Sequence, residues 1–174
     1  LTAEEHLLRG QGCITLKSLP SGDLIGGTDV VSAWAEQIAT EAELFIIDWE
    51  TREITFTSSY DGSVRKALIQ VPIGYDPSLP VPLLTSMYGL KETMTNGWQR
   101  YAADVNERGW LMVVPDKRKN TMTPAMRQDI VDAVAWVRQH YNVDPARIYA
   151  AGFSMGANNA LAVAAQVPDL FAAV

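Results

Sequence analysis

Short apolar runs alternate with helical segments in the second half of the chain, and this order constrains the fold more than any other feature. The apolar runs cover residues 83–88, 110–114 and 147–151, and each ends in a turn. The segments between them, residues 96–108 and 123–141, read as helices. Such an alternation predicts parallel strands joined by right-handed crossovers. We therefore expect an α/β fold with a mostly parallel sheet, whose sites lie beyond the carboxyl ends of the strands.

The second helical segment carries the clearer signal. Thr123 supplies a cap residue, and Pro124 occupies the first helical position, where its missing N–H costs nothing. Four apolar residues then recur at helical spacing: Ile130, Val134, Val137 and Tyr141. This pattern predicts a helix that buries one face.

The character of the chain changes near residue 50. Residues 1–50 form an N-terminal segment whose role the sequence does not indicate, with an amphipathic helix predicted at residues 32–44. From residue 53 the composition becomes that of strands, and the turn signal at residues 60–63 predicts an antiparallel hairpin with residues 64–72. We assign residues 51–174 to a second, α/β part.

Composition excludes several classes of function. The net charge of −6 leaves no basic field for phosphate backbones, so we expect no nucleic-acid partner. The sequence has no apolar run near the roughly 18 residues of a membrane span, so we expect no membrane partner. Cys13 is the only cysteine, and no spacing of His, Asp and Glu suggests a metal site. No cofactor is therefore expected.

The motif that carries chemistry is the pentapeptide at residues 152–156, Gly-Phe-Ser-Met-Gly, which follows the third apolar run and precedes an Ala-rich helix. A serine in a tight strand-to-helix turn has a strained backbone, and side chains two residues away on either side would collide. Glycine at both positions removes the collision. The turn presents the hydroxyl of Ser154 as a nucleophile and places the N–H of Met155 at the positive start of the helix, where an oxyanion forms.

Around this motif the sequence resembles the α/β-hydrolase superfamily, and within it the polyhydroxybutyrate depolymerase and feruloyl-esterase-like group. The resemblance runs from about Asp61 to Val174 and includes an Asp-Pro-x-Arg turn at residues 144–147. It implies an α/β-hydrolase fold, truncated after the helix that follows Ser154, and only the N-terminal part of a catalytic domain. In the family the acid and the histidine of the triad follow the serine. After Ser154, however, the sequence has no histidine and a single acid, Asp169.

One loop departs from this group, whose members place His-Gly after the first parallel strand. Here Tyr88-Gly89 stands in its place, as in relatives of prolyl oligopeptidase. That likeness implies that the phenol of Tyr88 donates to the oxyanion, replacing or supplementing a backbone donor at Leu90. The alternative is that Tyr88 only packs at the strand end.

Other polar and aromatic residues are weaker candidates. Asp116 follows the strand at residues 110–114 and is a candidate substrate-binding residue with Leu90; the alternative is an aspartate that caps its loop. His140 is expected to end its helix about one strand length, roughly 17 Å, from Ser154, too far for a base. His6 can be neither used nor excluded, and two tryptophans are expected in the core: Trp98 and Trp136.

The sequence thus predicts a serine esterase that cleaves small or polymeric carboxylic esters through an acyl-enzyme on Ser154. A prolyl-oligopeptidase-like serine peptidase and a non-catalytic relative remain as alternatives. The resemblance also implies an extracellular or periplasmic location. It further implies that a second chain or a further C-terminal segment pairs with the strand at residues 147–151 and supplies the acid and the histidine.

Overall fold

The computed structural model describes residues 5–9, 12–16, 50–119 and 123–174, which belong to two units, Leu1–Asp48 and Trp49–Val174. In the first unit, β1 (Glu5–Arg9) and β2 (Gly12–Leu16) form an antiparallel hairpin. The helix predicted at residues 32–44 lies outside the described residues. No helix in the described ranges has the length and apolar character that a membrane crossing requires.

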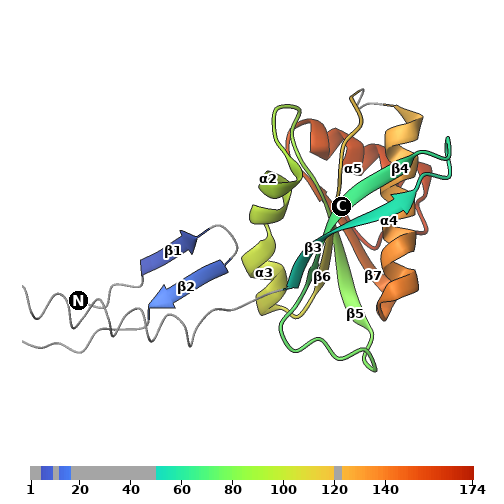
Figure 1. The fold of residues 1–174 in the computed structure, drawn as a ribbon. Coiled ribbons are helices and arrows are strands. Elements are labelled where there is room, and N and C mark those ends of the chain that lie inside the picture. Colours follow the sequence, from blue (N-terminus) through green and yellow to red (C-terminus); the bar gives the residue numbers. More distant parts are fainter. Residues whose placement is uncertain (1–4, 10–11, 17–49, 120–122) are drawn as a thin grey trace, which may run out of the picture. The chain divides into compact units, whose positions relative to one another are not determined.

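The second unit is built on a five-stranded mixed sheet in the order β3-β4-β6-β5-β7 (Figure 1). The strands are β3 (Glu50–Thr57), β4 (Val64–Val71), β5 (Val81–Met87), β6 (Leu111–Pro115) and β7 (Val143–Gly152). β5, β6 and β7 run parallel to one another, as the sequence predicts. The predicted hairpin is β3 and β4, and β4 joins it antiparallel to β6.

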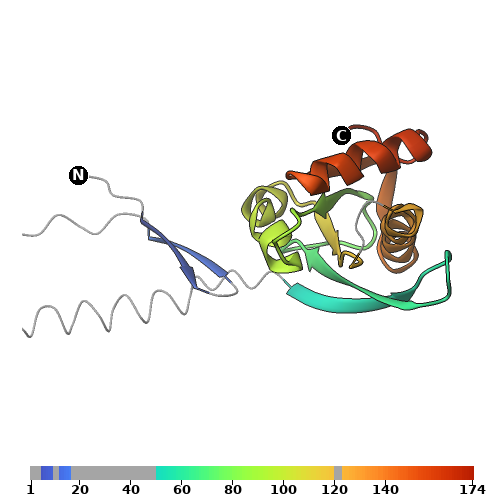
Figure 2. The same ribbon diagram turned by 90° about the horizontal axis from the view of Figure 1, so that it is seen from above.

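The helices lie on both faces of this sheet. The segment after β5 contains α2 (Met94–Gln99) and α3 (Ala102–Glu107), and these cover one face, whereas α4 (Pro124–His140) covers the other (Figures 1 and 2). The chain moves from β5 to β6 in one direction and returns past β5 to β7, so right-handed crossovers must place the two connections on opposite faces. α5 (Met155–Gln166) follows β7 and packs against β5, β7 and α4.

The prediction of a single helix at residues 96–108 is wrong in one respect. The structure has two short helices there, separated at Arg100 and Tyr101. Tyr101 has φ −128° and ψ −1°, outside the helical range, and the Asn96-Gly97 pair near the start has low helix propensity. The helix predicted at residues 123–141 is confirmed, with the Thr123 hydroxyl accepting a hydrogen bond from the Met126 N–H.

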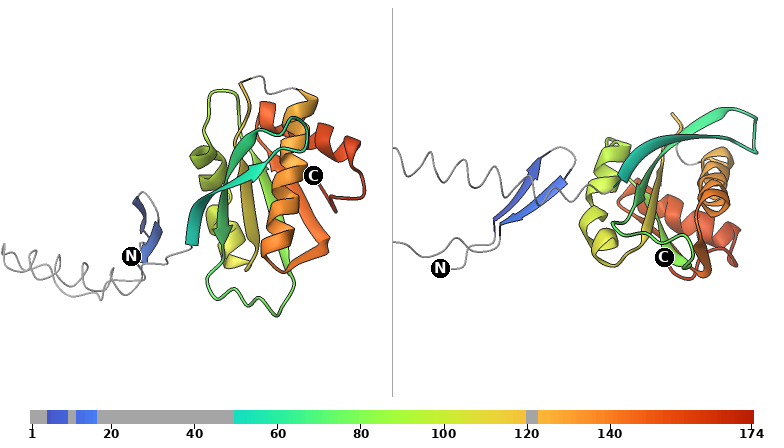
Figure 3. Two further views of the ribbon diagram at one scale, coloured as in Figure 1. Left: turned by 45° about the vertical axis from the view of Figure 1, so that its right-hand side comes forward. Right: turned by 60° about the horizontal axis from the view of Figure 1, so that its bottom comes forward.

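The core lies between the sheet and the pair α4 and α5. β6 is buried at every position, as expected for a central strand covered on both faces. Three residues of the predicted apolar stripe, Ile130, Val134 and Val137, are fully inaccessible to solvent, whereas the fourth, Tyr141, follows α4 and is half-buried. The β3–β4 hairpin curls around α4 (Figure 3), where Ser58 donates a hydrogen bond to Asp129 and Ser59 to Asp132.

This topology fixes where a site can lie. The order of strands reverses beside β5, so the loop after β5 and the turn after β7 meet at the carboxyl edge of the sheet. Crevices at such switch points are the usual ligand sites of open α/β sheets. Beyond β7, the backbone at Ala173 forms a parallel bridge to Tyr149, and the Ala150 N–H donates to the Ala173 carbonyl.

Candidate active site

The turn between β7 and α5, residues 152–156, is called the elbow below. Ser154 has φ 54° and ψ −120°, and it is the only non-glycine residue with positive φ among those that the structure describes. This conformation costs an L-residue of the order of 1–3 kcal/mol, and such strain persists only where the surroundings enforce it. The side chain of Ser154 is exposed to solvent.

The two glycines of the elbow explain how the turn closes. A Cβ on Gly152 would lie 2.3 Å from the backbone carbonyl of Gly156, and a Cβ on Gly156 would lie 2.3 Å from the carbonyl oxygen of Met87. Both contacts are with backbone, which has no room to move. The elbow is further fixed to the end of β5 because the Phe153 N–H donates to the Met87 carbonyl at 3.1 Å. The predicted role of both glycines agrees with this geometry.

The start of α5 gives the elbow its electrostatic character. The helix begins at Met155, so the first-turn N–H groups and the positive end of the helix dipole lie beside Ser154. No acidic residue occurs in this first turn to neutralise that field. A negative charge that develops on an atom bound to Ser154 is therefore stabilised here.

The 88–92 loop, which follows β5, faces the elbow and is stabilised by its own side chains. The N–H of Gly89 donates to Glu92 Oε2 at 2.7 Å, and Arg100 donates to the other carboxylate oxygen at 2.7 Å. These contacts lower the pKa of Glu92, first through the Gly89 N–H and also through the charge of Arg100. The guanidinium of Arg100 also lies over the ring of Phe153, 4.2 Å from its centroid, and so links the loop to the elbow.

Lys117 binds the same loop from the end of β6. Its ammonium nitrogen donates to three backbone carbonyls, those of Gly89 at 3.1 Å, Leu90 at 2.6 Å and Glu92 at 2.5 Å. The ammonium also lies 4.8 Å from the centroid of the Tyr88 ring. All three of its hydrogens thus have acceptors, and the loop has a fixed cation at its centre.

Tyr88 is buried at the base of this loop, with 4% of its surface exposed. Its hydroxyl donates to Asp116 Oδ1 at 2.6 Å and accepts from the Lys117 N–H at 3.0 Å. Burial and the hydrogen bond to the Asp116 carboxylate raise the pKa of Tyr88 well above its usual range. The phenol proton is therefore engaged with Asp116. The predicted roles of Tyr88 in the oxyanion hole and of Asp116 in substrate binding stay predictions.

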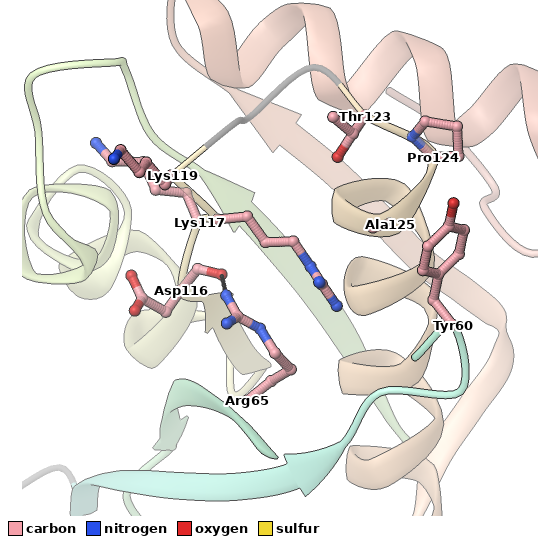
Figure 4. Close-up of a pocket in the computed structure, with 9 residues that line it drawn as sticks. Tyr60, Arg65, Asp116, Lys117, Lys119, Thr123, Pro124 and Ala125 are labelled. Atoms are coloured by element: carbon pink, nitrogen blue, oxygen red, sulfur yellow. Dashed lines mark hydrogen bonds between the residues drawn. The ribbon is translucent and has the colours of Figure 1, made fainter. Parts of the chain in front are cut away.

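A shallow pocket of about 570 Å³ opens next to Asp116 (Figure 4). Arg65 and Asp116 line one side of it, while Tyr60 and Pro124 line the other. Arg65 donates to the Asp116 carbonyl across 3.4 Å. Ser154 is not among the lining residues, so this pocket and the elbow are separate features of the described surface.

The substrate-binding role of Leu90 stays a prediction, and Trp136, expected in the core, is only half-buried. Leu90 is exposed on the 88–92 loop, and Trp98 is buried, with its indole N–H donating to Gln70. His140 ends α4, stacks on Trp136 and contacts its carbonyl, at the opposite end of β7 from Ser154. The side chain of His6 lies outside the described residues. Within the described ranges, no group of three or more His, Cys, Asp or Glu is arranged to hold a metal ion.

Sequence reasoning missed the residues that hold the 88–92 loop: Glu92, Arg100 and Lys117. Lys117 lies 25 to 28 positions from the carbonyls it binds, so no local pattern indicates the contact. Its position directly after Asp116, at the end of a strand beside β5, is the one available signal.

Comparison with known proteins places the fold. The model of the prolyl oligopeptidase family matches residues 116–174. No curated protein matches the sequence.

Several solved esterases and hydrolases share the architecture. A ferulic acid esterase from Anaeromyces mucronatus superposes with a TM-score of 0.55 at 18% identity, over 72% of this chain and 57% of that one. An S-formylglutathione hydrolase from Staphylococcus aureus superposes with a TM-score of 0.58 at 18% identity, over 72% of this chain and 57% of that one. A thermostable esterase superposes with a TM-score of 0.61 at 22% identity, over 74% of this chain and 40% of that one. This chain thus matches between 40% and 57% of the length of these three structures. With its switch-point sheet and its strained G-x-S-x-G turn, the second unit of this chain has the α/β-hydrolase fold.

Proposed function

We propose that this chain belongs to a serine hydrolase that cleaves carboxylic esters through an acyl-enzyme on Ser154. The observation that carries the proposal is the backbone of Ser154, with φ 54° and ψ −120°, enforced by two glycines that have no room for a Cβ. A protein with no use for the hydroxyl of Ser154 gains nothing from this strain.

The chemistry follows from the position of that hydroxyl. Ser154 Oγ attacks the ester carbonyl carbon and gives its proton to a base, which passes it to the departing alkoxide as the ester C–O bond breaks. Water then attacks the acyl carbonyl and gives a proton to the base, which returns it to Ser154 Oγ as the Oγ–acyl bond breaks and the carboxylic acid leaves. The N–H of Met155 stabilises the oxyanion of both tetrahedral intermediates.

The second oxyanion donor comes from the 88–92 loop. The phenol of Tyr88 and the N–H of Leu90 are the two candidates. The Tyr88 hydroxyl already donates to Asp116, whereas the Leu90 N–H has no hydrogen-bond partner among the described residues. This difference favours Leu90 as the donor and Tyr88 as a support at the strand end.

The base and its acid are proposed to come from sequence outside these 174 residues, either a further C-terminal segment or a second chain. In the part of the chain that the structure describes, His140 is the one histidine with a placed side chain, and it lies at the wrong end of β7. A structure of the full-length protein with a phosphonate on Ser154 should show a histidine within about 3 Å of Oγ. If that histidine is His6, this part of the proposal is wrong.

Reaction with a fluorophosphonate probe tests the function directly. The full-length protein should incorporate one probe at Ser154 and hydrolyse short p-nitrophenyl esters, and Ser154→Ala should abolish both. Ser78→Ala, which removes a serine from an exposed connector, serves as the matched control. No labelling of Ser154 would show that the protein is a non-catalytic relative.

Peptidase activity is the second candidate, because the prolyl oligopeptidase family model matches residues 116–174. The solved structures with this fold favour the esterase instead, since they include a ferulic acid esterase and an S-formylglutathione hydrolase. Cleavage of p-nitrophenyl esters, with no cleavage of prolyl or acyl-peptide substrates, would favour the esterase. The opposite preference would favour the peptidase.

A further inference from the structure

The ammonium group of Lys117 has a geometry that a merely structural surface lysine lacks. Three backbone carbonyls of the 88–92 loop converge on its nitrogen within 3.1 Å. The Tyr88 ring is also within cation–π distance of it, at 4.8 Å. An ammonium has three hydrogens, so this arrangement satisfies all of them and leaves no donor for a substrate.

The Gly89 carbonyl accepts from Lys117 at 3.1 Å and from the Glu92 N–H at 3.1 Å, and its orientation sets the direction of a neighbouring N–H. The Gly89 carbonyl and the Leu90 N–H belong to one peptide group, which is planar and trans, as are all the peptide bonds that the structure describes. The N–H of such a group points opposite to its carbonyl. When Lys117 binds the carbonyl on one side, the Leu90 N–H must therefore face away from Lys117.

The other contacts of the loop leave this N–H available. The preceding N–H, that of Gly89, is occupied by Glu92 at 2.7 Å. The ring of Phe153, which directly precedes Ser154, would lie 3.5 Å from a Cβ on Gly89, so the loop is in direct reach of the elbow. The Leu90 N–H is thus a backbone donor of this loop that no described group binds.

We infer that Lys117 is a positioning residue for the proposed hydrolase, which orients and polarises the Gly89–Leu90 peptide so that the Leu90 N–H serves as the second oxyanion donor. A cation on the carbonyl draws electron density through the peptide and strengthens the N–H as a donor. Because the donor is fixed before the reaction, no reorganisation is needed when the oxyanion forms. This inference rests on the proposed function, and Lys117 itself touches neither substrate nor Ser154.

The test is Lys117→Met in the full-length protein, which keeps the length of the side chain and removes the charge. For a p-nitrophenyl ester we expect kcat to fall roughly 100-fold, the effect of losing one oxyanion donor, with KM changed less than about threefold. Affinity for a boronic acid or trifluoromethyl ketone, which form a tetrahedral adduct with the serine, should fall by a similar factor. Lys91→Met removes the same charge from an exposed position of the same loop and should leave kcat unchanged.

Chemical rescue separates positioning from folding. In Lys117→Ala, added propylammonium should restore part of kcat, whereas tetramethylammonium, which has no N–H, should not. A Lys117→Met protein with wild-type kcat, or one that loses only thermal stability, would overturn the inference.

If neither variant folds, Lys117→Arg takes their place. Its planar fork cannot bind three converging carbonyls, and we expect at least a tenfold lower kcat. Wild-type kcat in Lys117→Arg, or failure of this variant to fold as well, would also overturn the inference. A wild-type protein that neither labels at Ser154 nor hydrolyses esters would instead remove the proposed function.

Discussion

The elbow and the 88–92 loop meet at the same edge of the sheet, but they are held in different ways. The elbow depends on the absence of side chains, since neither Gly152 nor Gly156 has room for a single methyl group. The loop depends on hydrogen bonds from side chains: Glu92 accepts from one of its N–H groups, and Lys117 donates to its carbonyl groups. Steric conflict therefore excludes substitution of the elbow glycines, whereas the polar contacts of the loop can be removed one at a time.

Of the substitutions that test this difference, Gly156→Ala should destabilise the fold most. Its Cβ would lie 2.3 Å from the Met87 carbonyl oxygen and 2.8 Å from the Tyr88 nitrogen, both backbone atoms. We expect the free energy of unfolding to fall by more than about 4 kcal/mol, the range reserved for severe backbone or packing conflicts. Urea unfolding followed by circular dichroism measures it.

Gly89→Ala is the matched change in the loop. Its Cβ would meet the flexible carboxylate of Glu92 at 3.2 Å, which can move aside. We expect a loss of about 1 kcal/mol. If the two alanine variants have equal stabilities, the contrast between a steric elbow and an adaptable loop is wrong.

Asp129→Asn tests the ion pairs that hold the chain next to Lys117, rather than the contacts of the 88–92 loop itself. Asp129 is fully buried on α4 and binds Arg118 at 2.6 Å and Arg65 at 3.0 Å, and Arg118 directly follows Lys117. Removing the charge leaves two partly buried guanidinium groups without their shared partner, and we expect a loss of about 3 kcal/mol in stability.

Asp132→Asn, on the same helix, provides the control. This carboxylate accepts from Ser59 at a more exposed position, so we expect a loss of about 1 kcal/mol. A loss from Asp129→Asn no larger than this would mean that the remaining partner of Arg118, Asp61 at 2.6 Å, or solvent replaces the lost charge.

The same difference explains which parts of the site the sequence could predict. The elbow depends on five consecutive residues and on the strand and helix that flank them, so a local pattern was sufficient. The parallel strands and α4 were predicted for the same reason. The 88–92 loop, in contrast, depends on Lys117, which lies at the end of another strand. Such contacts have no local signature.

Tyr88→Phe gives a smaller effect and decides between the two oxyanion donors. The substitution keeps the ring that faces Lys117 but removes the hydroxyl that joins Asp116 to the Lys117 N–H. We expect a loss of about 1–3 kcal/mol in stability, because two partly buried groups lose their hydrogen-bond partner. We expect kcat to fall less than about tenfold. A 100-fold loss in kcat with unchanged stability would assign the phenol to the oxyanion hole.

Acidification should produce the smallest effect, through Glu92. Its carboxylate accepts the Gly89 N–H and the Arg100 guanidinium, and these contacts lower its pKa below the usual value of 4.5. A pKa that is lower in the folded state means that the charged form stabilises the fold above about pH 4.5. This contribution is lost as the pH falls through the lower, folded-state pKa.

The variant Glu92→Gln isolates this effect because it cannot titrate. The wild-type protein should be more stable than Glu92→Gln near neutral pH, by a constant amount down to about pH 5, and the difference should then shrink as the pH falls further. Glu107→Gln, which removes an exposed carboxylate from α3, controls for the change in net charge. A difference that stays constant, or grows, on acidification would show that Glu92 is not held by the loop in its charged form. In that case Lys117 alone would carry the electrostatic support of the 88–92 loop.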